Sequence, residues 1–155
     1  MNLEAIGYVH AMEGHFQIKL NESYRDGLKE LSGFSHLQVI CWGHLTDNQE
    51  YRALTTLDKP YKNAPETIGV FATRSPARPN PILLSVSQVK EINVEAGVIE
   101  FYWLDLEEDT PVLDIKPYHP CTERVLDCKV PEWCSDWPES YDESATFDWS
   151  KVFNF

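Results

Sequence analysis

Two arginines and an asparagine stand in a proline-rich loop, and their side chains have the chemistry to bind anions. Arg74, Arg78 and Asn80 lie in the run 69–82, which also holds three of the ten prolines of the chain. Each proline fixes φ and removes a backbone donor, so this run is excluded from the middle of a sheet. A rigid polar loop between two strands is a common place for a ligand, but the pattern also fits a structural turn with solvated arginines.

A second group of reactive side chains lies near the ends of two apolar segments. His44 ends the apolar run 34–44, and Asp114, Lys116 and Tyr118 follow one another at every second position. Lysine and arginine suit a carboxylate ligand. Structural alternatives stay open, because Asp114 and Lys116 can form a surface ion pair and Tyr118 can anchor the chain end. His44, like His36, can equally be a hydrogen-bonded core residue.

Composition limits the class of protein. The chain has 155 residues, 43% hydrophobic and 25% charged, which fits one domain with a sizeable core. Its net charge of −12 opposes broad electrostatic binding to nucleic acid, so any contact with RNA requires a local basic patch. The candidates for such a patch are Arg74, Arg78, Lys116, Arg124 and Lys129.

The cysteines and the apolar runs predict the compartment. None of the four cysteines, Cys41, Cys121, Cys128 and Cys134, lies in a CxxC pair, and their spacing fits no common zinc pattern. We therefore expect free thiols and no metal. No apolar run approaches the roughly 20 residues of a membrane helix, and the first residues do not resemble a signal peptide. A cytoplasmic protein is expected.

Hydrophobic periodicity predicts many short strands. Strands are expected at 3–10, 15–20, 34–44, 67–73, 82–92, 97–104 and 112–115. One short helix is expected at 21–31, with a cap at Asn21 or Ser23 and a stop at Gly33. The chain beyond Pro120 is irregular, and its aromatic residues Trp133, Trp137, Trp149 and Phe153 are expected to pack rather than to stack on bases. This order of elements favours a mainly β fold, either a barrel or a sandwich.

Three separate segments resemble the TsaA-like, or TrmO, family. They are the loop 69–82, the segment Phe34-Ser35-His36-Leu37 and the segment 110–118, and the resemblance covers roughly residues 3–120. It implies a small TsaA-like β-barrel that forms a homodimer. It also implies an S-adenosylmethionine-dependent methyltransferase that acts on tRNA, at the exocyclic nitrogen of threonylcarbamoyladenosine next to the anticodon. The expected organisation is a barrel domain at 1–130 and an acidic, aromatic C-terminal extension at 131–155, packed on the domain or on the dimer partner.

The resemblance assigns roles position by position. Cofactor binding is implied for His44, Arg74, Leu84, Tyr102, Trp103, Leu104 and Asp105. Substrate binding is implied for Arg78 and Asn80, and site or catalytic roles are implied for Asp114, Lys116 and Tyr118. Methyl transfer to an amine depends mainly on alignment, and the proton that leaves the nitrogen needs an acceptor, for which Asp114 and His44 are the candidates. An aromatic face or a carboxylate, as at Tyr102, Trp103 and Asp105, suits the sulfonium cation.

The chain departs from the family pattern in four places. Leu83 and Asp109 stand where family members usually have glycine. The segment 10–15 turns straight back, without the Pro-Arg-Gln type loop that helps to hold the cofactor. The separate C-terminal domain of longer bacterial members has no counterpart here. These departures keep two alternatives open: a protein that binds S-adenosylmethionine without methylating tRNA, and a methyltransferase for a smaller substrate.

Overall fold

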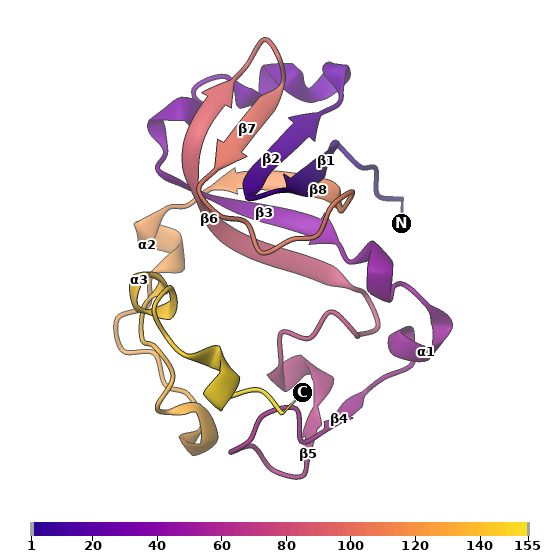
Figure 1. The fold of residues 1–155 in the computed structure, drawn as a ribbon, viewed down its shortest axis with the longest axis vertical. Helices are drawn as coiled ribbons and strands as arrows, with labels where there is room; N and C mark the ends of the chain where they lie inside the picture. Colours follow the sequence, from indigo (N-terminus) through magenta and orange to yellow (C-terminus); the bar gives the residue numbers. More distant parts are fainter. Residues whose placement is uncertain (1, 155) are drawn as a thin grey trace. The chain divides into compact units, whose positions relative to one another are not determined.

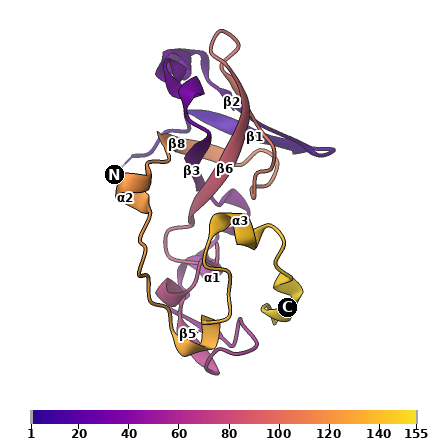
Figure 2. The same cartoon turned by 90° about the vertical axis from the view of Figure 1, so that its left-hand side faces the viewer.

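Six antiparallel strands close into a barrel in the computed structural model, which describes residues 2–154 (Figures 1 and 2). The strand order around the barrel is β1-β2-β7-β6-β3-β8, and β8 pairs with β1 to close it. The strands are β1 (Gly7–Met12), β2 (His15–Leu20), β3 (His36–Trp42), β6 (Ile82–Asn93), β7 (Val98–Phe101) and β8 (Pro111–Pro117). The mainly β barrel expected from the sequence is confirmed, and closure within one chain leaves no open sheet edge.

The alternation of apolar and polar residues explains which way each strand faces. Along β3, Leu37, Val39 and Cys41 are fully buried while the residues between them are half-exposed. The core inside the barrel is made by this strand together with buried residues of β1, β2, β7 and β8, such as Ile18 and Ile99, and partly buried apolar residues of β6 pack against it. Because fully burying one such aliphatic side chain contributes roughly 1.5–3 kcal/mol, the inward-facing set fixes the register of the strands.

A two-residue turn joins β1 to β2. Glu13 and Gly14 both have positive φ, at 54° and 80°, which is the conformation of a type I′ hairpin turn. The sequence expectation that the chain turns straight back here is confirmed. Asp109, at a position where related proteins were expected to have glycine, also has a left-handed backbone with φ at 59°. Aspartate tolerates this region better than most residues, so it fits the left-handed position in the turn before β8.

Several predicted elements differ in the structure. The strand expected at 3–10 begins at Gly7, and the strand expected at 97–104 ends at Phe101. The expected helix at 21–31 is a pair of 3₁₀ segments, η1 (Glu22–Leu28) and η2 (Leu31–Gly33). They are separated because Glu30 has a left-handed backbone with φ at 64°. Asn21 does not cap with its side chain, since its Nδ2 donates to the Ala5 carbonyl instead. The expected strand at 67–73 ends at Gly69, where the 3₁₀ turn η4 (Val70–Ala72) begins.

The chain divides into two compact units. Residues 2–48 and 80–124 form the barrel unit, and residues 49–79 and 125–154 form the second unit. The sequence predicted a domain boundary at residue 130. In the structure, residues 49–79 and 125–154 instead form one compact unit. Residues 1 and 155, the outer limits of the expected domains, lie outside the described part of the chain. The two units are described separately below.

An aromatic cluster forms the core of the second unit. Tyr61 stacks on Trp133 with ring centroids 5.4 Å apart and meets Trp137 edge-on at 5.1 Å. Trp149 and Phe153 extend the cluster. The expectation that the aromatic residues of the tail pack is confirmed, and their packing surface is the 61–68 region of the same unit.

The other elements of the second unit are short. They are α1 (Gln49–Arg52), the hairpin of β4 (Thr56–Asp58) and β5 (Thr67–Gly69), η5 (Glu132–Cys134), α3 (Tyr141–Ser144) and η6 (Trp149–Lys151). Two further short elements belong to the barrel unit, η3 (His44–Thr46) and α2 (Pro120–Glu123). Within residues 2–154 no helix combines the length and apolar character needed to cross a membrane.

The four cysteines carry free thiols, as expected. Cys121 and Cys128 are exposed, whereas Cys41 and Cys134 are buried. Burial in the barrel interior raises the pKa of the Cys41 thiol to about 12. Cys41 is therefore a small apolar core residue rather than a nucleophile at neutral pH.

Candidate functional site

The outer face of β3, β6 and β8 carries three of the predicted site residues of the barrel unit, Leu84, Asp114 and Lys116. In the β3–β6 pairing, Ile40 stands opposite Leu84 and Gln38 stands opposite Val86. On the other side of β3, Ile40 stands opposite Asp114 and Gln38 stands opposite Lys116. Paired residues share a face of the sheet, and none of these side chains belongs to the fully buried set inside the barrel.

Lateral pairing therefore sets these residues in rows across three strands. One row is Leu84, Ile40 and Asp114, and the next is Val86, Gln38 and Lys116. Neighbouring strands lie about 4.8 Å apart, so Leu84 and Asp114 are separated by roughly 10 Å across the sheet. The structure thus brings together three residues that the sequence predicted from distant segments. The sequence reasoning missed Gln38, Ile40 and Val86, because Ile40 stands in a continuous apolar run and the buried residues on either side of Val86 are serines.

Asp114 and Lys116 form an ion pair at the surface. Lys116 Nζ lies 2.6 Å from Asp114 Oδ2, and the Ile115 N–H donates to Asp114 Oδ1 at 2.9 Å. The hydrogen bond and charge of Asp114 raise the pKa of Lys116. Both side chains are about half exposed, so the pair contributes little to stability. The ion pair instead positions a carboxylate and an ammonium group side by side on the outer face.

A third row contains two of the predicted aromatic residues. His36 pairs with Gln88, the Tyr118 N–H donates to the His36 carbonyl at 3.0 Å, and the Tyr102 N–H donates to the Gln88 carbonyl at 3.2 Å. Tyr102 is 62% exposed and Trp103 is 51% exposed, which is high for such large apolar rings. Their exposure leaves both rings accessible to a flat or cationic ligand.

The rest of the segment 102–105 divides between the core and the surface. Leu104 is only 2% exposed and packs in the core, so only its main chain is available to a ligand. Asp105, the next residue, is exposed.

The outer face of β3, β6 and β8 is called the wall below. His44 and Asn80 lie at its other end. His44 opens the 3₁₀ turn after β3, and its Nδ1 is buried without a hydrogen-bond partner among residues 2–154. The Gly43 N–H donates to the Pro81 carbonyl at 2.7 Å, and a Cβ at Gly43 would approach Thr46 Oγ1 to 3.0 Å and the Pro81 carbonyl to 3.2 Å. Glycine at this position therefore allows the close approach that fixes His44 beside the start of β6.

The arginine loop, residues 70–79, belongs to the second unit and is held by its own side chains. Thr73 Oγ1 donates to the Val70 carbonyl at 2.8 Å and accepts from the Ser75 N–H at 3.2 Å. Ser75 Oγ in turn accepts from the Ala77 N–H at 3.2 Å. These successive hydroxyl-to-backbone bonds and the prolines stiffen the loop, as the sequence predicted.

The two arginines of this loop have different surroundings. Arg78 is half-buried, and its Nη2 donates to the Val70 carbonyl at 3.2 Å and to the Thr73 carbonyl at 3.3 Å. Arg78 thus ties the loop together with one nitrogen of its guanidinium. Arg74 is exposed. Its backbone contacts Tyr61, whose pKa is raised chiefly by burial, with the Arg74 backbone hydrogen bond acting in the opposite direction.

The predicted cofactor residues of the barrel unit do not converge on one point. Tyr102 lies level with Gln88, whereas His44 lies beyond the pair Trp42–Ile82. Six residues of β6 separate Gln88 from Ile82, which corresponds to about 20 Å along the strand. Leu84, Asp114 and Lys116 occupy the middle. The wall therefore carries a histidine end and an aromatic end, with the ion pair between them.

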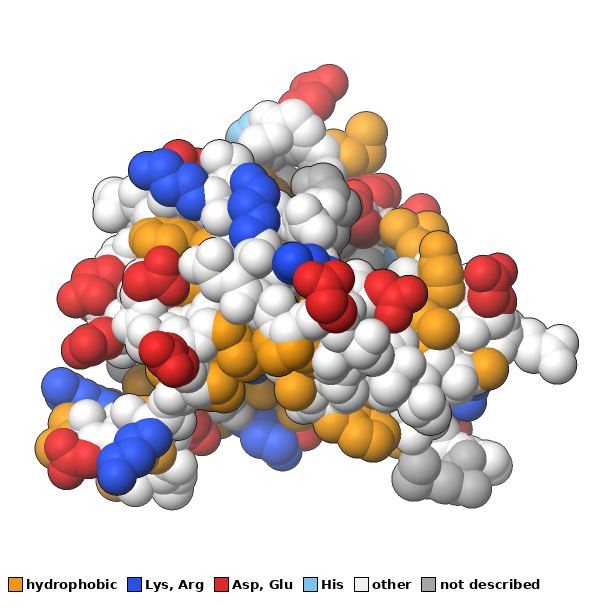
Figure 3. All heavy atoms as spheres, turned by 90° about the horizontal axis from the view of Figure 1, so that it is seen from below, with side chains coloured by type: hydrophobic (Ala, Val, Ile, Leu, Met, Phe, Trp, Pro, Cys, Tyr) orange, Lys and Arg blue, Asp and Glu red, His pale blue; other side chains and the backbone are white. Residues whose placement is uncertain are grey.

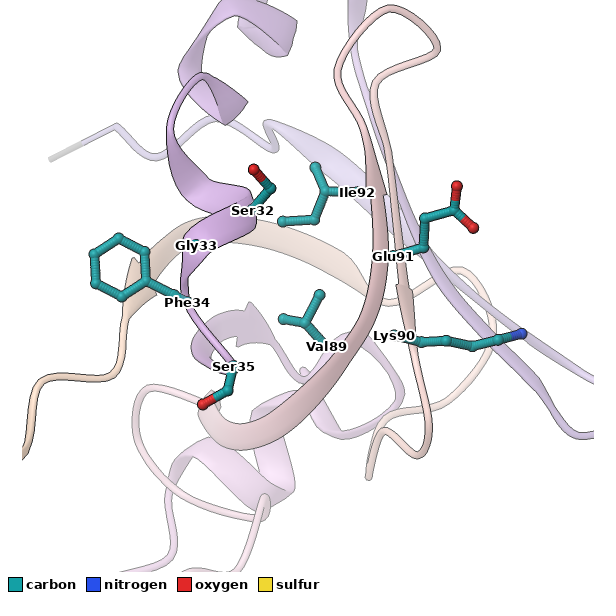
Figure 4. Close-up of a pocket in the computed structure, with 8 residues that line it drawn as sticks. All are labelled: Ser32, Gly33, Phe34, Ser35, Val89, Lys90, Glu91 and Ile92. Atoms are coloured by element: carbon teal, nitrogen blue, oxygen red, sulfur yellow. The ribbon is translucent and has the colours of Figure 1, made fainter.

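Two surface hollows lie elsewhere on the barrel unit. The larger, of about 470 Å³, is lined by residues 32–35 and 89–92, where the β6–β7 register shifts (Figure 4). Val89 and Ile92 point toward the 32–35 segment, whereas Lys90 and Glu91 point away from it (Figure 4). This hollow contains none of the predicted site residues. A second hollow, of about 350 Å³, lies beside β1 and β2.

Charged side chains do not form a field of one sign on the face shown in Figure 3, where acidic residues are scattered among basic and hydrophobic ones. With a net charge of −12, the chain offers RNA only local basic groups. Lys116 on the barrel wall and Arg74 in the arginine loop are two such groups.

Comparisons with known proteins agree with this closed β-barrel. The family model for the tRNA-methyltransferase O N-terminal domain, TrmO_N, matches residues 8–124, so the chain belongs to this family. It is 35% identical over 126 residues to the tRNA (adenine(37)-N6)-methyltransferase of Escherichia coli, covering 80% of this chain and 53% of the relative. It is 36% identical over 112 residues to the S-adenosyl-L-methionine-binding protein of Archaeoglobus fulgidus, covering 72% of each chain.

A solved structure shares the fold. The crystal structure of TrmO from Pseudomonas aeruginosa superposes with a TM-score of 0.65 at 27% identity, covering 83% of this chain and 60% of the other. The chain thus spans about half the length of the Escherichia coli relative and about three fifths of the Pseudomonas structure.

Proposed function

We propose that the chain binds S-adenosylmethionine and transfers its methyl group to the exocyclic nitrogen of threonylcarbamoyladenosine next to the anticodon of tRNA. The observation that carries this proposal is the register that sets Leu84, Asp114 and Lys116 on one outer face of the barrel. Membership of the TrmO_N family and the printed functions of the relatives support it. A cytoplasmic location follows from such a substrate and is part of the same proposal.

The charge and polarity of each side chain indicate which part of the cofactor or substrate it would bind. The guanidinium of Arg74 suits the cofactor carboxylate, and Lys116 and Arg78 suit the carboxylate of the threonyl group. Leu84 supplies an apolar contact, and Tyr102 and Trp103 offer aromatic faces to the sulfonium or to a flat ring. Asn80 and Tyr118 add polar contacts at the two ends of the wall.

The reaction needs a proton acceptor. The nitrogen of the modified base forms a bond to the methyl carbon as the bond from carbon to sulfur breaks, and the nitrogen then loses a proton. Asp114 is our first candidate to take it, because its carboxylate lies in the middle of the wall and is oriented by Lys116 and by the Ile115 N–H. His44 is the second candidate, since its buried Nδ1 has no hydrogen-bond partner within residues 2–154.

A homodimer reconciles the spacing of the proposed cofactor residues. The histidine end and the aromatic end of the wall lie about 20 Å apart along β6. A two-fold axis that crosses the strands near Val86 would bring the histidine end of one copy opposite the aromatic end of the other. Symmetric dimers are the commonest assemblies and use the same patch on both copies. The exposed apolar side chains of Ile82 and Leu84, 43% and 41% exposed, suit such a contact.

Mixing two inactive variants tests the shared site. One variant is His44→Ala, at the histidine end, and the other is Tyr102→Ala with Trp103→Ala, at the aromatic end. If sites form between copies, mixing them in equal amounts restores about a quarter of the wild-type cofactor sites, because half of the dimers carry one intact site of two. If each site lies within one chain, mixing restores none, and this part of the proposal fails.

Methyl transfer itself is tested with labelled cofactor. Purified full chain is incubated with tRNA that carries the threonylcarbamoyl group and, in parallel, with the same tRNA lacking it. The proposal expects label only in the first tRNA, and a strong loss of the rate in Asp114→Asn with cofactor binding retained. The absence of label under saturating conditions would exclude this substrate.

A second function is favoured by two observations. The net charge of −12 opposes broad electrostatic binding to tRNA, and the tight turn at Glu13-Gly14 stands where the family resemblance implies a longer loop that helps to hold the cofactor. The chain would then bind S-adenosylmethionine, as the name of the Archaeoglobus relative states for that protein, without methylating tRNA. Calorimetry showing cofactor binding without turnover on any RNA would support it. Methylation of a small acceptor that bulk tRNA does not inhibit would instead indicate a smaller substrate.

A further inference from the structure

We propose a second site, for a divalent cation, at His10, Glu108 and Asp109 of the barrel unit. One potential ligand atom from each of these residues, an imidazole nitrogen or a carboxylate oxygen, lies within 4.8 Å of the other two. The site is formed by β1 and by the turn that precedes β8, and it contains none of the residues assigned above to cofactor or substrate. Sequence reasoning missed it, because nearly a hundred residues separate its two parts.

Closure of the barrel brings the two parts together. The β1–β8 pairing covers Gly7 and Tyr8, and main-chain bonds continue it, with the Val9 N–H donating to the Thr110 carbonyl and the Asp109 N–H donating to the Val9 carbonyl, each at 3.0 Å. Within residues 2–154, β1 has no main-chain pairing with β8 beyond Val9, and the Glu108 carboxylate accepts the next hydrogen bond from β1. Its Oε2 accepts from the Ala11 N–H at 2.6 Å. The backbone of β1 thereby fixes the carboxylate beside His10.

The chemistry of the three side chains suits a cation of intermediate hardness. Glu108 Oε1 lies 3.1 Å from His10 Nδ1, and the Asp109 side chain is exposed beside them. One imidazole and two carboxylates are ligands for Zn²⁺ or Mn²⁺. Bonds of about 2.0–2.2 Å to such an ion bring ligand atoms to roughly 3–3.5 Å from one another, so closure needs a movement of about 1 Å. The side chains of His10 and Glu108 are 44% and 35% exposed, which leaves them room to make it.

The neighbouring hollow gives the ion access and further ligands. His10 and Asp109 line the hollow of about 350 Å³ together with Lys19 and Arg25. The Arg25 guanidinium is held by the β6–β7 turn, where its Nη1 donates to the Glu95 carbonyl at 3.3 Å, so the remaining ligands of the ion would be water molecules from the hollow. The strongly acidic chain also attracts cations to its surface.

Metal titration of the full chain tests the site. The protein carries Cys121→Ser and Cys128→Ser, because both thiols are exposed and would bind Zn²⁺ on their own. After treatment with a chelator, calorimetry with Zn²⁺ alone and with Mn²⁺ alone is expected to show one ion per chain. Mn²⁺ is also expected to broaden the backbone NMR signals of residues 9–11 and 108–110 selectively.

Matched variants separate this site from adventitious binding. His10→Ala and Asp109→Asn are each expected to weaken Zn²⁺ binding about tenfold or more, and asparagine keeps the left-handed backbone available at position 109. His15→Ala, which removes an exposed histidine of the same hairpin, is expected to leave binding unchanged. The site is refuted if the parent binds neither ion at millimolar concentration, or if His15→Ala weakens binding as much as His10→Ala. Mn²⁺ broadening centred elsewhere would also refute it.

Discussion

Removing the guanidinium of Arg78 should loosen the arginine loop and weaken cofactor binding without unfolding the barrel. Arg78 is the side chain that joins the start of the loop to its end, through the bonds from its Nη2 to the carbonyls of Val70 and Thr73. The hydroxyl bonds of Thr73 and Ser75 span only two or three residues each. In Arg78→Ala those local turns remain, but the two longer bonds to Val70 and Thr73 are lost.

The expected size of the effect follows from the two bonds. A hydrogen bond from a charged donor contributes about 1.5–3 kcal/mol net. Because Arg78 is only half-buried and both bonds come from one nitrogen at 3.2–3.3 Å, we take about 2 kcal/mol for the pair together. If the ordered loop is the form that binds the cofactor, this loss weakens the affinity for S-adenosylmethionine by at most about thirtyfold.

The assay is calorimetry with S-adenosylmethionine, together with limited proteolysis of the loop. Arg78→Ala should bind more weakly and be cut sooner within residues 70–79, whereas Arg124→Ala, which removes an exposed arginine of the barrel unit, should match the wild type in both assays. Unchanged affinity and unchanged proteolysis in Arg78→Ala would refute the view that this arginine holds the loop in its binding form.

Three further predictions concern burial and packing. A thiol reagent at neutral pH should modify two cysteines quickly, Cys121 and Cys128, and leave the buried pair intact until the chain unfolds; rapid modification of three or four would contradict the burial. Because the pKa of Cys41 rises from 9.0 unfolded to about 12 folded, the unfolded chain binds fewer protons in this window, so the free energy of unfolding should fall as pH rises from 9 to 12. Urea unfolding should show this slope in the wild type and a shallower slope in Cys41→Ala, where the raised pKa values of Lys116 and Tyr61 still act in the same direction. Gly43→Ala should destabilise the barrel by about 1–3 kcal/mol because its Cβ would crowd Pro81, whereas Gly69→Ala, with no atom within 4 Å of the added Cβ, should not.

The sequence predicted most strands because they are short apolar runs bounded by turn residues. The run 34–44 was predicted as a buried central strand, but Val39, Ile40, Cys41 and Trp42 are all apolar, so the face of β3 that enters the core follows only from the structure. The segment 21–31 was harder. Its apolar residues fit a helix, but nothing local revealed that Glu30 would take a left-handed backbone and split it.

The site was only partly visible in the sequence for a different reason. Motifs located Asp114 and Lys116 two residues apart, and period-two spacing already implies a shared face. That Leu84 lies in the same row depends on how β6 and β8 both pair with β3, which is a property of the closed barrel rather than of any one segment. The role of Arg78 as a tie within its loop likewise depends on tertiary hydrogen bonds that residue type does not specify.

Calorimetry on two exposed leucines tests the central claim most directly, namely that the outer face of β3, β6 and β8 holds the cofactor. Leu84 is 41% exposed on this face, and Leu126, 78% exposed, lies in the second unit. Leu84→Ala should weaken binding of S-adenosylmethionine by about 1 kcal/mol or more, since apolar contact is lost, and Leu126→Ala should leave it unchanged. Equal affinities in the wild type and in Leu84→Ala would contradict the claim and place the cofactor elsewhere.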